Sequence, residues 1–256
     1  MKLSIITPSF NQGQFIEQCI NSVINQDYPN IEYLIIDGAS SDQTVDIIKK
    51  YEANITYWVS EKDSGQTSAI NKGIIKSSGE IVAYLCSDDY YAPGIAKFIM
   101  NKFISDPNLD MIYGNCTFVD EQGYIQRHKK SINFSRNKLL RRNIIWQPTV
   151  FIRKYVFDEV GLFDEELHYA MDYEFWLRIS EKFNIVNIDK DLAFYRWHKN
   201  SKTITSEIKH LKEAYSIARK YNGGGLYSYF MHCIYWPRTS KIKHLIFKIY
   251  SKFRKH

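Results

Sequence analysis

The sequence is poor in the features that would hold a disulfide framework or a structural zinc ion. Its 256 residues include only four cysteines, which lie far apart and show no CxxC spacing. Structural zinc sites need clustered cysteine and histidine ligands, so none is expected. We interpret the cysteines as reduced packing thiols of a cytosolic protein: Cys19, Cys86, Cys116 and Cys233.

Several other signals are missing as well. No apolar run approaches the ~18 residues of a membrane-spanning helix, and the opening MKLSIITPSF enters a strand pattern without a signal-peptide core. Neither GxGxxG nor GxxxxGK[ST] occurs, so the sequence lacks the motifs of dinucleotide-binding proteins and of P-loop proteins. With 45% hydrophobic and 24% charged residues, the chain suits one large cytoplasmic domain, or one domain with an extension.

Positive charge is concentrated at the C-terminal end. Residues 206–256 hold 11 Lys/Arg against 2 Asp/Glu, a balance of +9, whereas residues 1–205 hold 23 against 26, a balance of −3. A mildly acidic body joined to a basic tail predicts two parts with separate roles. We place the boundary between 1–205 and 206–256.

Strand and helix patterns alternate through the first half of the chain. Strand patterns cover 2–10, 31–40, 55–61 and 80–89, and helical patterns cover 11–26, 41–52 and 64–78. This alternation predicts an α/β fold with a largely parallel sheet and helices on both faces. Beyond it we expect a helix over 94–106, a strand over 110–120, an irregular polar segment over 121–143, mixed elements over 146–183 and a strand pattern over 184–201.

The predicted strands end in small and acidic residues. The strand over 80–89 closes with Asp88 and Asp89, and the other three end in TPS, DG and SEKD. Two carboxylates about 5 Å apart repel by roughly 3 kcal/mol at an effective dielectric of about 20, so solvent, a helix N-terminus or a cation must offset the cost. Such residues are also ordinary turn formers. Four in succession favour a ligand site at the carboxyl edge of the sheet.

Five segments resemble, in the same order, the family 2 glycosyltransferases with the GT-A fold. They are SIITPSFNQGQFIEQCINSVINQDYPNIEYLIIDGASSDQT, SEKDSGQTSAINKGI, SDD, QPTVFIRKYVFDEVGLFDEEL and MDYEFWLR. The resemblance covers roughly residues 2–200 and leaves out the tail after about Ser206. It implies a GT-A, Rossmann-like, mixed and mostly parallel sheet. The activity it implies is inverting, metal-dependent sugar transfer from a nucleotide sugar, with a UDP-sugar as the expected donor.

The resemblance also implies a divalent cation, Mn²⁺ or Mg²⁺, at the acidic pair. Asp89 would be its ligand, while Asp88 would lie nearer the ribose or share the metal. His198 would reach the metal or the diphosphate, with a plain surface histidine as the alternative. Arg196 would be a phosphate partner. Carboxylate oxygens suit such hard cations, which stabilise the charge on a departing diphosphate.

The other strand ends would hold the nucleoside and the phosphates. By resemblance, Pro8 and Ser9 line the base and ribose, the carboxylate of Asp37 accepts from a base N–H, and Gly38 beside it allows close approach. Gly65, Gln66 and Lys72 would flank the base and the phosphates.

Two of these residues have an alternative interpretation. Lys72 could be a solvated charge on its helix, and Asp37 could be a turn residue.

Asp172 occupies the position of the family's catalytic base, although Met171 replaces the usual acidic neighbour. A carboxylate there would take the proton of the acceptor hydroxyl. The alternative, which does not exclude the first, is a cap of the helix that follows. We expect Glu174 to point elsewhere, Trp176 to lie in the core, and the segment 146–148 to shape the acceptor side.

The tail SKIKHLIFKIYSKFRKH, residues 240–256, can be written as a basic amphipathic helix. Such helices lie on anionic membranes, which would suit a lipid-linked saccharide acceptor and a place at the inner face of the cell membrane. Packing on the body or on a second subunit is the alternative. No standard nucleic-acid motif is present, so nucleic acid is not expected as a partner.

The sequence leaves two other functions open. A sugar nucleotidyltransferase shares the sheet architecture, but TPSFNQGQF lacks the cations of its phosphate loop. A non-catalytic sugar- or nucleotide-binding homologue is opposed by the joint presence of Asp88, Asp89 and Asp172. We therefore expect a glycosyltransferase acting on a glycan or lipid-linked saccharide in surface polysaccharide biosynthesis.

Overall fold

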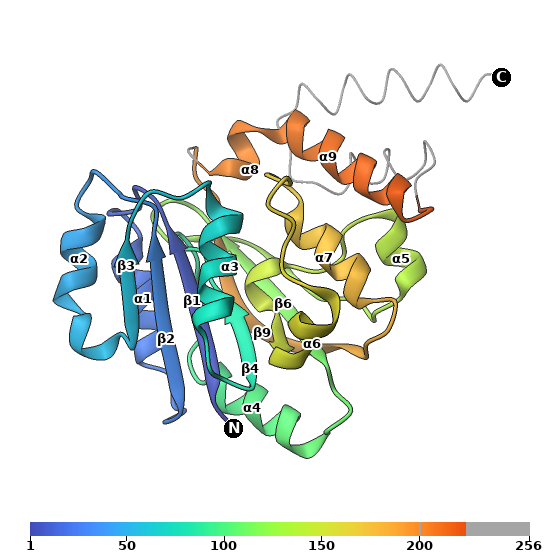
Figure 1. Cartoon of the computed structure of the whole chain (residues 1–256), viewed down its shortest axis with the longest axis horizontal. Coiled ribbons are helices and arrows are strands. Elements are labelled where there is room, and N and C mark those ends of the chain that lie inside the picture. Colours follow the sequence, from blue (N-terminus) through green and yellow to red (C-terminus); the bar gives the residue numbers. More distant parts are fainter. Residues whose placement is uncertain (200, 224–256) are drawn as a thin grey trace.

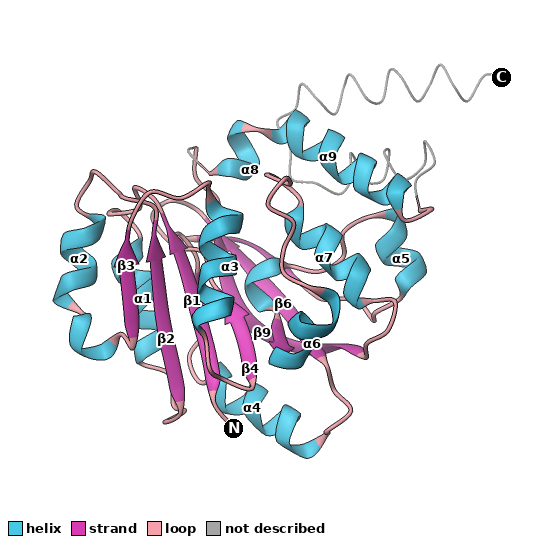
Figure 2. Ribbon diagram, in the orientation of Figure 1, coloured by secondary structure: helices cyan, strands magenta, loops and turns pink. Residues whose placement is uncertain are grey.

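One mixed sheet organises the protein (Figures 1 and 2). The structure is a computed structural model that describes residues 1–199 and 201–223. Within them the strand order is β3-β2-β1-β4-β8-β6-β9-β5, with β7 paired to β6. The strands are β1 (Leu3–Ser9), β2 (Ile31–Asp37), β3 (Tyr57–Ser60), β4 (Ile81–Tyr84), β5 (Tyr90–Tyr91), β6 (Met111–Val119), β7 (Ile125–Lys129), β8 (Phe151–Arg153) and β9 (Ile185–Arg196).

The sheet is parallel where the sequence alternates strand and helix. Strands β3, β2, β1 and β4 pair in parallel, and so do β6 and β9. The short strand β8 lies between β4 and β6 and runs antiparallel to both. The carboxyl ends of β1, β2, β3 and β4 therefore meet at one edge, as predicted.

Helices cover both faces of this sheet (Figure 1). Helices α1 (Ile16–Ile24), α2 (Thr44–Lys50) and α4 (Ile95–Ser105) pack into one core cluster. The other cluster takes in α3 (Gln66–Lys76), α5 (Arg136–Arg141), α6 (Lys154–Val160), α7 (Met171–Ile179) and α9 (Glu207–Lys220). The remaining short helices are α8 (Lys202–Thr205) and the 3₁₀ turns η1 (Glu52–Asn54) and η2 (Gln147–Thr149).

The central strands show why the sheet is covered twice. In β1, Ile5 belongs to the core cluster of one face and Ile6 to that of the other. In β2, Ile35 and Ile36 divide in the same way. Since successive side chains of a strand point to opposite faces, a continuous apolar run needs a helix layer on each side. The predicted α/β architecture is confirmed.

Two local predictions were wrong. The segment 121–143 is not irregular, because it contains strand β7 and helix α5. The residues of β7 are exposed except for Lys129, which is partly buried, so the sequence showed no alternating apolar pattern from which this strand could be predicted. Helix α1 begins at Ile16 rather than at Asn11 or Gln12, because hydrogen-bonded turns occupy the intervening residues.

Helix α9 lies against α7, beyond the predicted boundary at residue 205 (Figure 1). Its apolar side chains join the core cluster that contains α7, through Ala214, Ile217 and Ala218. The boundary itself stays a prediction. The basic amphipathic segment 240–256 falls outside the described residues. Among those that are described, no helix combines the length and apolarity needed to cross a membrane.

Candidate active site

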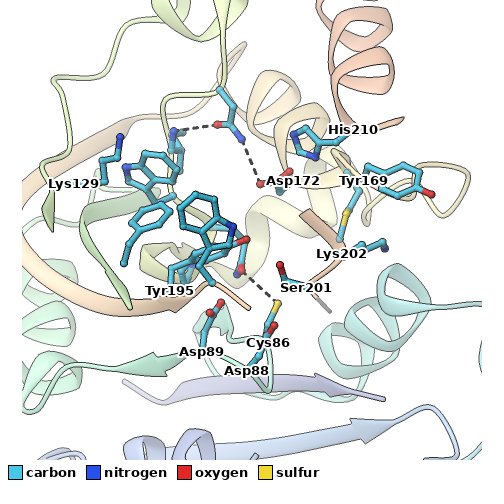
Figure 3. A pocket seen from close by; sticks show the side chains of 18 of the residues that line it. Cys86, Asp88, Asp89, Lys129, Tyr169, Asp172, Tyr195, Ser201, Lys202 and His210 are labelled. Carbon is cyan, nitrogen blue, oxygen red and sulfur yellow. Dashed lines mark hydrogen bonds between the residues drawn. The ribbon is translucent and has the colours of Figure 1, made fainter. Parts of the chain in front are cut away.

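A cavity of about 290 Å³ opens where β4, the β6–β7 region, α7 and α9 converge (Figure 3). Asp88 and Asp89 lie at one end of it and Asp172 at the other (Figure 3). Aromatic side chains form much of the wall between them: Phe118, Trp146, Tyr169, Tyr195 and Trp197. The two acidic sites that the sequence indicated separately therefore share one cavity.

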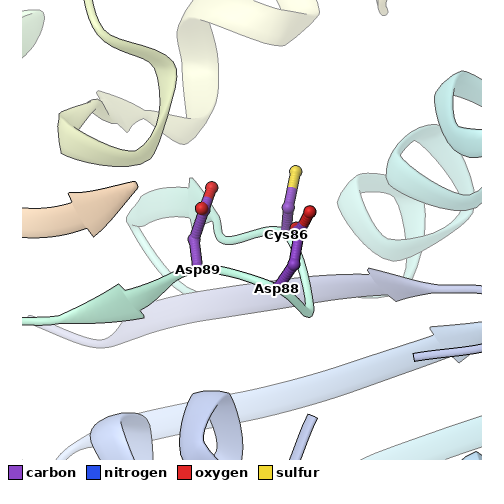
Figure 4. A group of neighbouring side chains, drawn as sticks. All are labelled: Cys86, Asp88 and Asp89. Atoms are coloured by element: carbon purple, nitrogen blue, oxygen red, sulfur yellow. The ribbon is translucent and has the colours of Figure 1, made fainter. Parts of the chain in front are cut away.

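The acidic pair sits in a tight turn directly after β4. The amide of Asp89 donates to the carbonyl of Cys86 (2.9 Å), and its Oδ1 accepts from the backbone N–H of Arg196 (2.8 Å). Asp88 Oδ2 lies 3.1 Å from Nε2 of His198. The ligand atoms of Cys86, Asp88 and Asp89 all lie within 4.8 Å of one another, and Figure 4 shows the three side chains pointing to the same side.

The charges of this turn are poorly compensated by the protein. Burial, and then the charge of Asp88, hold the pKa of Asp89 well above its usual value. Burial, and then the charges of Asp88 and Asp89, raise the pKa of the Cys86 thiol, which therefore stays protonated at neutral pH. A cation bound between the two carboxylates would relieve this repulsion.

Arg196 does not offer its side chain to a phosphate in this structure. Its guanidinium donates to the carbonyls of Asp88, Asp120 and Glu121 and to Oε1 of Gln18. The side chain is buried and instead ties the acidic turn to the start of the β6–β7 turn. His198 is also buried, and its Nδ1 has no partner among the described residues.

Asp172 is the second residue of α7 and is partly buried. Its Oδ1 accepts from the amide of Tyr173 (2.7 Å), and its Oδ2 lies 3.4 Å from Nδ2 of Asn143. Burial outweighs these contacts and raises the pKa of Asp172 to about 6. The cap position of α7 is Ala170, so Asp172 is not the N-cap residue.

Two other expectations for this helix hold. Glu174 points away from the cavity, because its carboxylate bonds to Arg178 (2.8 Å) and to the hydroxyl of Tyr221 (2.5 Å). Trp176 is fully buried in the core. Asp172 is therefore the carboxylate of α7 that faces the cavity.

The residues predicted to bind the nucleoside lie at the ends of β1 and β2, outside the cavity lining. Pro8 and Ser9 are buried, and the hydroxyl of Ser9 has no partner among the described residues. The carboxylate of Asp37 accepts from Ser40 and Ser60. A Cβ on Gly38 would lie 3.1 Å from the carboxylate of Asp63, so a larger residue would crowd this edge.

Of the three predicted binding residues in and before α3, only Gln66 lines the cavity. Its Nε2 lies 3.1 Å from the sulfur of Cys86. Gly65 precedes the helix with φ of 117°, a conformation that favours glycine. Lys72, one turn and a half later, pairs with Glu61 at 2.7 Å on the exposed side, which agrees with the alternative of a solvated charge.

Sequence reasoning missed residues on the wall of the cavity. Asn143 contacts Asp172 from a stretch without a clear period, so no pattern marked it. Gln147 belongs to the segment 146–148 that was expected to shape the acceptor side; it lines the cavity and donates to the carbonyl of Tyr84 at the end of β4 (2.7 Å). Lys129, predicted to be in an irregular segment, lines the cavity from β7 beside the ring of Trp146.

Known structures share this architecture at low sequence identity. TarS of S. aureus, residues 1–349 in complex with UDP-GlcNAc, aligns with a TM-score of 0.69 and 20% identity, over 96% of this chain and 70% of that one. The mannosyltransferase PcManGT of Pyrobaculum calidifontis, in complex with GDP-Man and Mn²⁺, aligns with a TM-score of 0.66 and 17% identity, over 86% and 64%. The fold is therefore the GT-A fold.

Sequence comparison gives the family. Residues 4–161 match the model of glycosyl transferase family 2. An uncharacterised glycosyltransferase of Rickettsia typhi is 30% identical over 222 residues, which cover 82% of this chain and 68% of that protein. The chain belongs to glycosyl transferase family 2 and is a glycosyltransferase. The predicted family is confirmed, and Asp172 and His198 lie beyond the residues that the family model matches.

Proposed function

We propose that this enzyme transfers a sugar from a UDP-sugar to a hydroxyl group of a saccharide acceptor, with inversion at the anomeric carbon and with a divalent cation. The observation that carries the proposal is the single cavity with Asp88 and Asp89 at one end and Asp172 at the other. A paired carboxylate site and a separate lone carboxylate divide the work as such a transfer requires, into leaving-group stabilisation and proton removal.

The acidic turn fits a hard divalent cation. Asp88 and Asp89 offer carboxylate oxygens close together, and burial and the neighbouring charge of Asp88 make the ionised form of Asp89 costly without a cation. The bound Mn²⁺ of PcManGT supports this choice. A cation here would supply positive charge for the departing diphosphate. We propose Asp89 as the ligand, with Asp88 and His198 beside it, and leave the protonated Cys86 out.

Asp172 is suited to remove the proton of the acceptor hydroxyl. A pKa of about 6 leaves it mostly ionised at pH 7, yet more basic than an exposed aspartate. Because it lies across the cavity from the acidic turn, an acceptor between the two would attack the side of the anomeric carbon opposite the leaving group. Attack from that side inverts the configuration.

The donor would lie along the carboxyl edge of the sheet. UDP-GlcNAc bound by TarS supports a UDP-sugar, and GDP-Man bound by PcManGT provides the alternative to test. We propose that the base and ribose contact the ends of β1 and β2 and that the diphosphate lies at the start of α3. The residues are Pro8, Ser9, Asp37, Gly38, Gly65, Gln66 and, with its ion pair opened, Lys72.

The acceptor would be a glycan or a lipid-linked saccharide of a surface polysaccharide. The aromatic wall of the cavity, with Trp146, Tyr169 and Trp197, supports a saccharide, because flat aromatic faces suit the apolar faces of sugar rings. Polar groups beside it, among them Asn143, can then orient the hydroxyls.

The function is tested by incubating the full chain with UDP-GlcNAc or GDP-Man, with and without Mn²⁺, and measuring release of the nucleoside diphosphate. We expect Mn²⁺-dependent release of UDP. With a saccharide acceptor, NMR should show a β-linked product from the α-linked donor. Retention of the α configuration, or release of neither nucleotide, would contradict the proposal.

We further propose that the basic segment 240–256 attaches the enzyme to an anionic membrane surface at the cytoplasmic face. Deleting residues 241–256 should abolish co-sedimentation with liposomes that contain anionic lipid, while UDP release stays unchanged. High salt should abolish it for the full chain, since each basic residue adds only about 1 kcal/mol that salt screens. A full chain that never binds liposomes, and a lower melting temperature after deletion, would indicate packing instead.

A further inference from the structure

Glu213 of helix α9 bonds to the segment that leads into α7. Its Oε1 accepts from the backbone N–H groups of Tyr169 (2.7 Å) and Ala170 (2.7 Å), and its Oε2 from that of His168 (3.1 Å). One carboxylate thus accepts hydrogen bonds from three consecutive backbone amides. Bonds from amides to a charged acceptor are among the stronger ones in proteins, so this segment is firmly held.

Helix α9 is itself fixed on the body, which gives Glu213 a defined place. Leu211, Ala214 and Ala218 are buried on its inner side. Just beyond its last turn, the hydroxyl of Tyr221 donates to Glu174 of α7 (2.5 Å). Since burial and this bond both hold α9 against α7, the carboxylate of Glu213 can act as a rigid anchor.

The three amides lie immediately before the proposed base. Ala170 is the cap residue of α7, and Asp172 follows two residues later. The same segment contributes His168 and Tyr169 to the cavity, and α9 contributes His210. A shift of residues 168–170 would therefore move the carboxylate of Asp172 together with that wall of the cavity.

We propose that Glu213 is a positioning residue for sugar transfer, which holds the 168–170 segment so that Asp172 faces the acceptor. Helix α9 is then part of the catalytic unit, although it lies beyond residues 4–161 of the family match and on the tail side of the predicted boundary. The inference rests on the proposed role of Asp172 as base.

A second effect of Glu213 provides a readout that fold stability alone would not change. Its negative charge adds to the burial that raises the pKa of Asp172. The other titratable or charged groups that line this cavity come from β4 and the acidic turn, β7 and the loop after it, the α5–η2 loop, the segment before α7, β9, α8 and α9: Tyr84, Cys86, Asp88, Asp89, Lys129, Lys130, Arg142, His168, Tyr169, Tyr195, Lys202 and His210. Removing the negative charge of Glu213 while these groups stay in place should lower the pKa of Asp172.

The experiment compares Glu213→Ala and Glu213→Gln with the exposed control Lys212→Gln on the same helix. At pH 8, Glu213→Ala should lower kcat by about 10- to 100-fold, because a displaced base transfers protons poorly, while KM for UDP-GlcNAc stays within about twofold. Glu213→Gln keeps one carbonyl for the Tyr169 and Ala170 amides and should stay within about threefold of the parent. In both, the acid limb of the pH–rate profile should move to lower pH. The control should match the parent.

Two results would overturn the inference. One is a Glu213→Ala enzyme with the kcat of the parent at pH 8 while Asp172→Asn is inactive. The other is an acid limb that keeps its place in Glu213→Gln. If Glu213→Ala does not fold, the Gln variant decides alone, by whether its acid limb moves to lower pH. An Asp172→Asn enzyme as active as the parent would instead overturn the proposed base, and this inference with it.

Discussion

Replacing Asp89 with alanine should lower the rate of sugar transfer by roughly 100-fold or more. This corresponds to about 3 kcal/mol of transition-state stabilisation. The carboxylate of Asp89 is buried and accepts a hydrogen bond from the backbone amide of Arg196. Its removal would take a ligand from the proposed cation and leave the departing diphosphate without full neutralisation.

The metal dependence of stability checks the same assignment without activity. A ligand that binds only the folded state raises the melting temperature, so Mn²⁺ should raise it for the parent and not for Asp89→Ala. Asp46→Ala, which removes an exposed carboxylate from α2, should behave like the parent in both assays. Full activity of the parent in excess EDTA would show that no cation takes part.

Replacing Asp172 with asparagine should lower kcat by about 10² to 10⁴, the usual cost of losing a general base. Asparagine keeps the size of the side chain and an oxygen for the amide of Tyr173 but accepts no proton at neutral pH. Affinity for the nucleotide sugar, measured by calorimetry with Mn²⁺, should stay within about threefold, because Asp172 lies across the cavity from the acidic turn. Asp158→Asn on the exposed side of α6 is the matched control.

The pKa of Asp172 leads to one expected outcome for the parent and one for this variant. The rate of the parent should fall as the pH drops through about 6, where the base becomes protonated. A pKa raised by folding means that the charged form destabilises the folded state as the pH rises from about 4 to about 6. At pH 7, Asp172→Asn should therefore have a higher melting temperature than the parent. A parent-like rate, or a lower melting temperature, would contradict the assignment.

The paired carboxylates could be predicted from the sequence because their position follows from local rules. An apolar run that ends in Ser87-Asp88-Asp89 places those groups at the end of a strand, and alternating helices place that end at a shared edge. No distant contact needs to be known for this step. The same reasoning placed Asp37 and Gly38 at the end of β2.

What the sequence could not provide are contacts between segments far apart in the chain. Glu213 was assigned to a basic extension, because the change in charge after residue 205 concealed the apolar face that packs on α7. Arg196 was expected at a phosphate, yet its guanidinium bonds to backbone carbonyls, which have no signature in a residue pattern. Lys72 lies on the predicted helix, but its side chain forms an ion pair with Glu61 on the exposed side of that helix.

The contacts between β9 and the acidic turn also set the order in which the enzyme can mature. Asp89 bonds to Arg196 and Asp88 to His198, both more than 100 residues later in the chain, and β5, which directly follows the turn, pairs only with β9 among the described strands. A nascent chain that has reached β8 holds the nucleoside edge of the sheet but none of these partners. The proposed cation site is thus completed only when β9 and the residues just after it are present, and chains stalled before them during synthesis would lack it.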